Sequence, residues 1–268
     1  GTFMMPSKQL LFDRYIFDHQ KVHDNAKKYI KYVKNIELVE TNKYANLKAI
    51  QQDLMLDKIN NDHCQYFKFV TNIQMIKLAQ IIELNKFVNL VSLIITFSEF
   101  NQPLNNLPET LQDIRIHNGP FNQPLDNLPK GLRILYLCIC NEFNQPLNNL
   151  PLGLKKLFVL GHSFTYDLDN LPTELQSLCI FSNIFSHDLN NLPSTLKDLT
   201  AKLNQPTSFS KIPKTITKLM VFSNYFLDNI PFNINTLALN TNLNIPLYDS
   251  LPINLKSLSL RGENFNQP

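Results

Sequence analysis

The sequence predicts a solenoid in which short parallel β-strands stack one above another, and three observations support this fold class. A nine-residue segment recurs almost unchanged at 100–108, 121–129 and 143–151. An apolar pattern, Leu-x-x-Leu-x-Φ with Φ any apolar residue, begins three residues after the proline that ends each segment. The pattern recurs in steps of 18 to 22 residues, a period typical of solenoids. One unit cannot bury its apolar faces alone, so neighbouring units must cover them.

Each copy of the apolar pattern predicts one short strand. In 132–137 the residues Leu135 and Leu137 alternate, so they share one face of that strand. Adjacent strands then pair in parallel through right-handed crossovers. The strands are predicted to begin near Val33, Cys64, Leu90, Leu111, Leu132, Leu154, Leu175, Leu196, Ile216, Ile234 and Leu255.

The segment that returns from one strand to the next carries Leu-Pro, and this predicts an extended or turn-like limb instead of an α-helix. Proline has no backbone N–H and fixes φ, which breaks helices. The phenylalanine eight residues before each proline is predicted to stack inside this limb as a continuous spine. Its members are Phe100, Phe121, Phe143, Phe164 and Phe185.

Eight residues after many strand starts comes an asparagine, which is predicted to point inward and bond the turn backbone of adjacent units. Losing such a buried bond costs roughly 1–3 kcal/mol. The members of this group are Asn183, Asn204, Asn224 and Asn242, with Cys140 at the same place.

Ahead of Leu90 the units are longer, and their return segments differ. Residues 47–59 and 73–87 have apolar residues at helical spacing and no proline, which predicts two helix-backed units over 33–89. Residues 13–31 predict an amphipathic helix within a cap over 4–32, which would cover the open edge of the sheet. Residues 90–268 form the proline-backed units, continuous with the preceding segment.

The repeated residues resemble a known family. Leu-x-x-Leu-x-Leu-x-x-Asn/Cys resembles the leucine-rich repeat, and Phe-Asn-Gln-Pro-Leu-x-Asn-Leu-Pro resembles the FNIP repeat, a short variant found in social amoebae and giant viruses of amoebae. The resemblance covers about Leu90 to the end. It implies a leucine-rich-repeat-type α/β superhelix, mostly β, with its parallel sheet on the concave face. Because the chain stops on Phe-Asn-Gln-Pro268, further units are expected beyond it.

The resemblance also implies a class of partner. Proteins with FNIP repeats often carry an N-terminal F-box, and the solenoid is then the substrate-recognition arm of a ubiquitin-ligase adaptor. This chain departs from that pattern, since no F-box motif precedes Asp13. Ubiquitin-ligase components are therefore one expected kind of partner, beside a protein or peptide of another kind.

Composition argues against other classes of partner. A net charge of +3 with 18% charged residues is too mild for nucleic acid as the main ligand. No apolar stretch approaches the roughly 18 residues that span a bilayer, and no signal peptide is evident. The four cysteines lack the spacing of a disulfide framework, which predicts a reducing compartment, the cytoplasm, or the host cytoplasm for a viral protein.

Several residues fit a metal site or a catalytic site, but each fits a plainer role better. His19 and His23 lie four apart on the predicted helix without a third ligand, so packing of the cap is favoured. Cys138-x-Cys140 has no second pair, and Cys140 occupies the asparagine position of the repeat. The lysines near the end of that helix favour a solvated face; they are Lys27, Lys28, Lys31 and Lys34.

Asp113, Arg115 and His117 occupy alternate positions of one predicted strand, where they place an acid, a cation and a base within reach of one another. A hydrolase would also need an activated nucleophile or a metal, and a pocket that excludes water. The sequence shows neither, so it predicts a polar binding patch or a solvated surface. We expect no catalytic residue, no metal and no cofactor.

The predicted binding face consists of the residues two, four and six past each strand start, which point away from the core. The three middle strands are mostly apolar at these positions, and exposed apolar patches usually mark interfaces. The alternative is that these side chains merely shield each other, because the sheet curves tightly or because the loop 203–210 folds over them. The predicted partner-binding residues are Arg115, His117, Ile134, Tyr136, Lys156, Phe158, Leu160 and Phe181.

The sequence thus predicts a protein–protein interaction module whose anchors are Tyr136, Phe158 and Phe181, because aromatic residues inside a polar rim are typical hot spots. Two alternatives stay open. One is a structural or self-assembling array that associates through the open C-terminal end. The other is an enzyme whose site has no recognisable motif.

Overall fold

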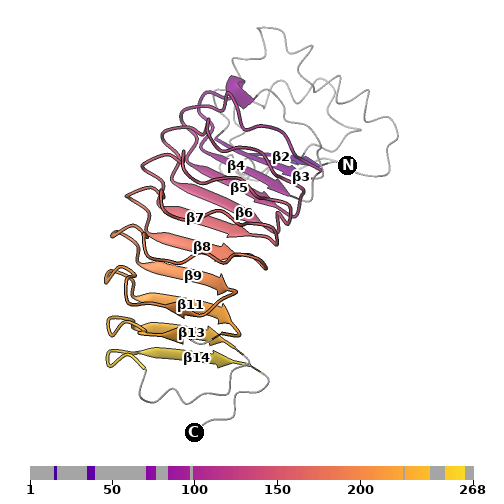
Figure 1. The fold of residues 1–268 in the computed structure, drawn as a ribbon. Coiled ribbons are helices and arrows are strands. Elements are labelled where there is room, and N and C mark those ends of the chain that lie inside the picture. The colour runs from indigo at the N-terminus through magenta and orange to yellow at the C-terminus, as the bar shows by residue number, and fades with distance from the viewer. Residues whose placement is uncertain are drawn as a thin grey trace, which may run out of the picture.

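The chain folds as a solenoid of parallel β-strands, seen in a computed structural model (Figure 1). The structure describes residues 15–16, 35–39, 71–76, 84–96, 99–225, 227–241 and 251–262. Within these ranges, twelve strands form one sheet in chain order, and every neighbouring pair is parallel. The predicted stack of parallel strands is confirmed.

The strands of the large sheet are β1 (Tyr15–Ile16), β2 (Asn35–Val39), β3 (Asn72–Ile76), β4 (Ser92–Thr96), β5 (Asp113–His117), β6 (Ile134–Cys138), β7 (Lys156–Leu160), β8 (Ser177–Phe181), β9 (Asp198–Leu203), β11 (Lys218–Ser223), β13 (Thr236–Asn240) and β14 (Ser257–Arg261). Two return limbs pair through β10 (Thr207–Ser208) and β12 (Leu227–Asp228). In the described part of the chain the one helix is the short 3-10 turn η2 (Leu84–Lys86). Each large-sheet strand from β4 onward begins two residues after its predicted start.

The strands bury and expose alternate residues, as period-two alternation requires. In β6 the inward Leu135 and Leu137 are fully buried, whereas the alternate residues Ile134, Tyr136 and Cys138 are partly exposed. Pairing in register places Leu135 beside Ile114 of β5 and Leu157 of β7. Equivalent repeat positions therefore lie side by side, and the inward ones form one continuous core.

The return limbs are extended and turn back into the next strand at Leu-Pro, as predicted. The amide of Leu111 donates to the carbonyl of Pro108 at 3.0 Å, and the amide of Leu132 donates to that of Pro129 at 3.0 Å. The same bond recurs in each later unit, so proline serves as the acceptor of a tight turn that needs no proline N–H.

The phenylalanine spine is confirmed. Its five side chains are at most 1% exposed, and successive rings stack with centroid distances of 5.8 to 6.2 Å and interplanar angles of 5° to 16°. Offset stacking of this kind is a favourable geometry for aromatic pairs. The spine supplies the return limb with a core that its extended backbone lacks.

A ladder of asparagines joins neighbouring return limbs at a position the sequence interpretation did not single out. The Oδ1 atom of Asn101 accepts a hydrogen bond from the amide of Asn122 at 2.9 Å, and that of Asn122 accepts one from Asn144 at 3.0 Å. Oδ1 of Asn144 then accepts one from the amide of Thr165 at 3.1 Å. Each of these asparagines directly follows a spine phenylalanine, so each satisfies a backbone donor of the next unit.

The asparagine position eight residues after each strand start is confirmed at two places. Cys140 is buried with its Sγ atom 3.6 Å from the carbonyl oxygen of Ile116. Asn204 donates to the carbonyls of Ser182 and Phe185 at 3.0 and 2.9 Å. Its side chain thus bonds the turn backbone of the adjacent unit.

At two other places this prediction is wrong, because Asn183 and Asn224 are exposed. The preceding serines, Ser182 and Ser223, are buried instead. Each serine hydroxyl accepts a hydrogen bond from the backbone amide two residues later, which forms a local turn. In this turn the serine side chain takes the inward position that was predicted for the asparagine. Asn242 lies outside the described residues.

The predicted N-terminal units need correction. The strand predicted from Val33 is confirmed as β2, but the next described strand, β3, overlaps the beginning of the predicted helix 73–87. Ile73 and Ile76 have helical spacing, whereas Ile73 and Met75 have strand spacing, so this short run alone does not decide between the two. In the structure, Ile73 pairs with Leu93 of β4 and is buried, so this segment is a strand. The start predicted at Cys64 lies outside the described residues.

The predicted helix 13–31 is wrong at its beginning, where Tyr15 and Ile16 form β1 alongside β2. Aromatic and β-branched residues favour strands, and the edge of β2 offers free backbone partners. The rest of this helix, with His19, His23 and the lysines, and the helical stretch 47–59 lie outside the described residues.

Candidate functional site

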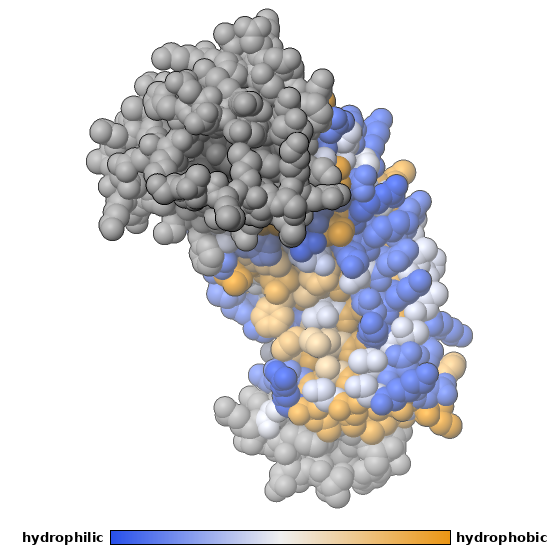
Figure 2. All heavy atoms as spheres, turned by 180° about the vertical axis from the view of Figure 1, so that it is seen from behind, coloured by the Kyte–Doolittle hydropathy of each residue, from blue (hydrophilic) through white to orange (hydrophobic). Residues whose placement is uncertain are grey.

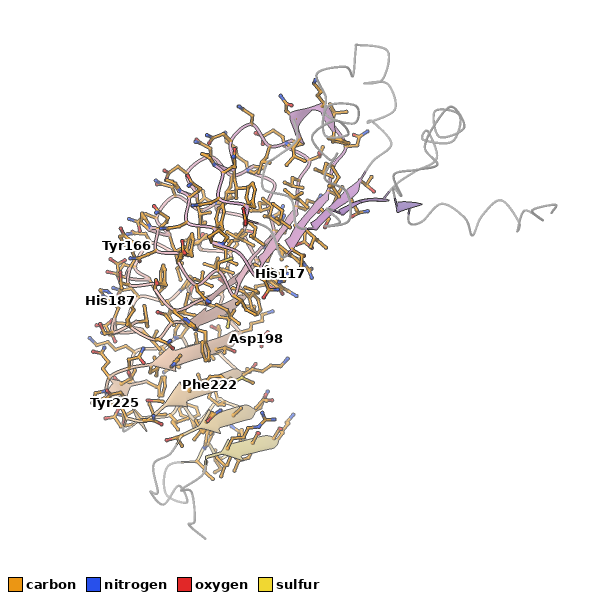
Figure 3. All side chains as sticks on the ribbon, turned by 90° about the vertical axis from the view of Figure 1, so that its right-hand side faces the viewer. His117, Tyr166, His187, Asp198, Phe222 and Tyr225 are labelled. Carbon is orange, nitrogen blue, oxygen red and sulfur yellow. The ribbon has the colours of Figure 1, made fainter. Side chains whose placement is uncertain are left out.

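The outer face of the sheet consists of the strand side chains that point away from the core. Because the strands pair in register, these side chains form three rows across the strands. Figure 2 views this face and shows apolar side chains gathered across its middle and hydrophilic ones along one side. In Figure 3, His117 and Asp198 lie on the sheet side, and Tyr166, His187 and Tyr225 lie on the opposite, return-limb side.

All eight residues predicted to bind a partner lie on the outer face. Ile134 and Lys156 are neighbours in the first row. The second row contains Arg115, Tyr136 and Phe158, and the third contains His117, Leu160 and Phe181.

The first aromatic pair joins β6 to β7. The rings of Tyr136 and Phe158 lie 4.1 Å apart between centroids and tilt by 49°. The guanidinium of Arg115 on β5 sits 4.9 Å from the Tyr136 centroid, a cation–π contact. Burial raises the pKa of the Tyr136 hydroxyl, so this ring is neutral at physiological pH.

The second aromatic pair joins β8 to β11 across β9. The rings of Phe181 and Phe222 lie 5.0 Å apart at 75°, an edge-to-face contact. Lys202 is on β9, the strand between β8 and β11, and its Nζ atom is 5.2 Å from the Phe181 centroid. Each pair therefore consists of two aromatic rings in contact, with one cationic side chain next to one of the rings.

These outer aromatic side chains are only partly buried. Tyr136, Phe158 and Phe181 keep intermediate exposure, whereas inward residues such as Leu157 are fully buried. Cys179 is the exception on this face, at 5% exposure in the row beside Phe158. The rings therefore shield one another in part and still present apolar area to solvent.

Asp113, Arg115 and His117 do not form a catalytic relay. The Nε and Nη2 atoms of Arg115 donate to both carboxylate oxygens of Asp113 at 2.8 to 3.1 Å, and these bonds raise the pKa of Arg115. Burial, and then the nearby Arg115, lower the pKa of His117. Because the Asp113 carboxylate binds Arg115 through both oxygens, it does not orient the His117 imidazole as a general base would require.

The described cysteines are free thiols without the environment of a reactive site. Burial raises the pKa of Cys140 and that of Cys179 to about 12, and burial also raises the pKa of Cys138. Such thiols stay protonated at neutral pH and are poor nucleophiles. Within the described ranges, no three His, Cys, Asp or Glu side chains cluster as metal ligands would.

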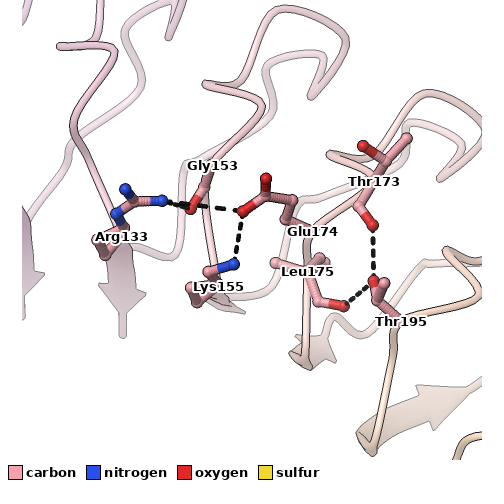
Figure 4. Close-up of polar contacts among 7 residues, drawn as sticks. All are labelled: Arg133, Gly153, Lys155, Thr173, Glu174, Leu175 and Thr195. Carbon is pink, nitrogen blue, oxygen red and sulfur yellow. Dashed lines mark hydrogen bonds and ion pairs between the residues drawn. The ribbon is translucent and has the colours of Figure 1, made fainter.

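A separate polar cluster lies beside the strand starts (Figure 4). Glu174 accepts a hydrogen bond from Nζ of Lys155 at 2.5 Å and lies 3.9 Å from Nη1 of Arg133, which also bonds the carbonyl of Gly153. Lys155 lowers the pKa of Glu174. These side chains are largely exposed, so solvent screens the ion pairs and they contribute little stability.

Lys202 and Phe222 lie on the predicted outer face but were not among the eight residues predicted to bind a partner. A signal was present, since both lie six positions after a strand start, as Phe181 does. Register alone assigns them to the face, but their contact with Phe181 depends on side chains that lean across β9.

Comparison with known proteins finds no matching family model and no significantly similar curated protein. No helix in the described part of the chain has the length and apolarity needed to cross a membrane.

Proposed function

We propose that the chain is a protein-interaction module whose outer sheet face binds a protein or peptide. The observation that carries this proposal is the pair of partly exposed aromatic clusters, Tyr136–Phe158 and Phe181–Phe222, on a sheet held rigid by a continuous core. Aromatic anchors with cationic borders are typical of binding hot spots. The site lacks the relay, reactive thiol or metal cluster that would favour catalysis among the described residues.

The proposal includes a finer description of the fold. We assign the solenoid to the leucine-rich-repeat type with FNIP units, with the sheet on the concave side and a helical N-terminal cap. The stacked Phe and Asn residues of the insert support this assignment, since each has a structural role at its repeat position. The partner would then be a cytoplasmic protein. The resemblance to FNIP repeats suggests a ubiquitin-ligase component or a substrate of such a ligase.

The test replaces the three predicted anchors together, Tyr136→Ser, Phe158→Ser and Phe181→Ser. We expect the variant to keep the folded sheet, because these side chains lie outside the core, and to lose capture of a specific partner from an amoebal lysate. Circular dichroism measures folding, and quantitative mass spectrometry measures capture.

A matched control carries Tyr166→Ser and Tyr225→Ser, two aromatic residues 41% and 43% exposed on the return-limb side. This control should capture the partner normally. Unchanged capture by the folded triple variant would exclude the outer face, and unfolding of the triple variant would show that these residues belong to the core.

A further inference from the structure

Two lysines beside the aromatic clusters carry charges that no described acidic side chain neutralises. Lys156 is exposed on β7, two residues before Phe158. Lys202 reaches over Phe181, and its Nζ atom donates to the neutral amide oxygen of Asn183 at 2.5 Å. Among the described residues, neither lysine forms an ion pair.

The other charges in these rows, from β5 to β11, are paired. Arg115 binds both oxygens of Asp113, and Lys218 lies 3.9 Å from Asp198. The carboxylates of the face are thus already engaged with other cations. The unbalanced charge at the aromatic clusters is therefore positive, and it is concentrated at Lys156 and Lys202.

The register sets the distance between the backbone positions of these two lysines. Lys156 lies in the first row of β7 and Lys202 in the third row of β9, two strands away. With strands about 4.8 Å apart and a rise of about 3.3 Å per residue, their Cα atoms are about 16 Å apart. An extended chain covers that distance in about five residues. The line between the two lysines crosses β8 at Cys179, and Phe158 and Phe181 lie next to it on one side.

We propose that the partner presents to this face an extended peptide segment in which two acidic residues, about five positions apart, flank apolar side chains. The inference rests on the proposed function and adds the chemistry of the partner. The acidic residues meet Lys156 and Lys202, and the apolar residues contact the two aromatic clusters. Charge pairs at the border of an apolar contact set orientation and speed association.

The experiment selects peptides from a random-peptide display library on the full chain, with the triple serine variant as counter-selection. Enriched peptides should carry Asp or Glu on both sides of Leu, Phe, Tyr or Ile. Lys156→Glu with Lys202→Glu should weaken their binding about tenfold or more, because two border charge pairs together reach about that factor. Replacing both peptide acids with lysine should restore binding to this double variant.

A matched control is Lys197→Glu with Lys214→Glu, which changes the net charge equally at exposed residues outside the outer rows. It should bind the selected peptides as the unmodified chain does. Enriched peptides with neutral or basic flanks would overturn the charge inference and leave the interaction face intact. An absence of enrichment would overturn both proposals, and so would peptides, selected without the counter-selection step, that all bind the triple serine variant equally well.

Discussion

Ile139 adopts a backbone conformation that suits its residue type poorly, with φ at 59°. The left-handed region costs a β-branched residue roughly 1–2 kcal/mol relative to residues that tolerate it. Asn118 occupies the same place in the preceding unit, with φ at 57°. Both residues lie seven positions after the predicted strand start of their unit, Leu111 or Leu132. Ile139 is 53% exposed, so burial of its side chain offsets little of this cost.

Ile139→Asn should therefore raise the free energy of unfolding by about 1 kcal/mol, since asparagine tolerates the left-handed region. Urea denaturation followed by circular dichroism measures the change. The matched control is Ile184→Asn, because Ile184 is also 53% exposed and its φ is not positive. A similar gain in the control would mean that removing an exposed isoleucine, and not relief of backbone strain, is responsible.

At the scale of strands and return limbs, the sequence predicts most of the fold because the repeat superimposes many weak signals. The strand starts from Leu90 to Leu255 agree with the structure, since period-two alternation recurs in each of these units and a Leu-Pro or Ile-Pro turn precedes each start from Leu111 onward. The asparagine ladder of Asn101 and Asn122 was missed because its bonds cross between units, at a position where sequence shows only a polar residue. Where repetition fades, at β3, strand and helix spacing could not be separated.

The candidate site was predictable to the same degree. Alternation assigns Tyr136 and Phe158 to one face, and equal steps assign them to one row. The pairing of Phe181 with Phe222 over the intervening β9 could not be predicted, because it depends on rotamers and on the twist of the sheet. The ion pair between Arg115 and Asp113 was equally open, since Arg115 lies two positions from both Asp113 and His117 and its side chain could have turned toward either.

The spine makes a prediction about the return limbs. Phe143 stacks on two neighbours, Phe121 and Phe164, at 6.1 and 6.2 Å. Phe143→Ala should lower the free energy of unfolding by about 3–5 kcal/mol, through lost burial and the cavity left behind. A small loss, well below this range, in a denaturation experiment would contradict a stacked spine.

For the whole molecule, the decisive property is that backbone pairing and the stacking of the return limbs join adjacent units in the described part of the chain. Each strand pairs with the strand before it and the one after it, and the Asn and Phe contacts likewise join successive return limbs. Stability of such a stack is approximately a sum of unit terms and nearest-neighbour terms. The position of the outer face then depends on the regular register of all units, although the aromatic clusters occupy only β6 to β11.

Hydrogen exchange of the Phe143→Ala variant tests this nearest-neighbour organisation. Phe143 lies in the limb between β6 and β7, so amide protection should fall most in these strands and in the adjoining β5 and β8. Protection in β13 should change little, because units far along the stack open locally and independently of a defect in the middle. Exchange under native conditions, read peptide by peptide by mass spectrometry, measures both effects in one sample. A uniform loss of protection from β4 to β13 would instead show that the solenoid unfolds as one cooperative unit.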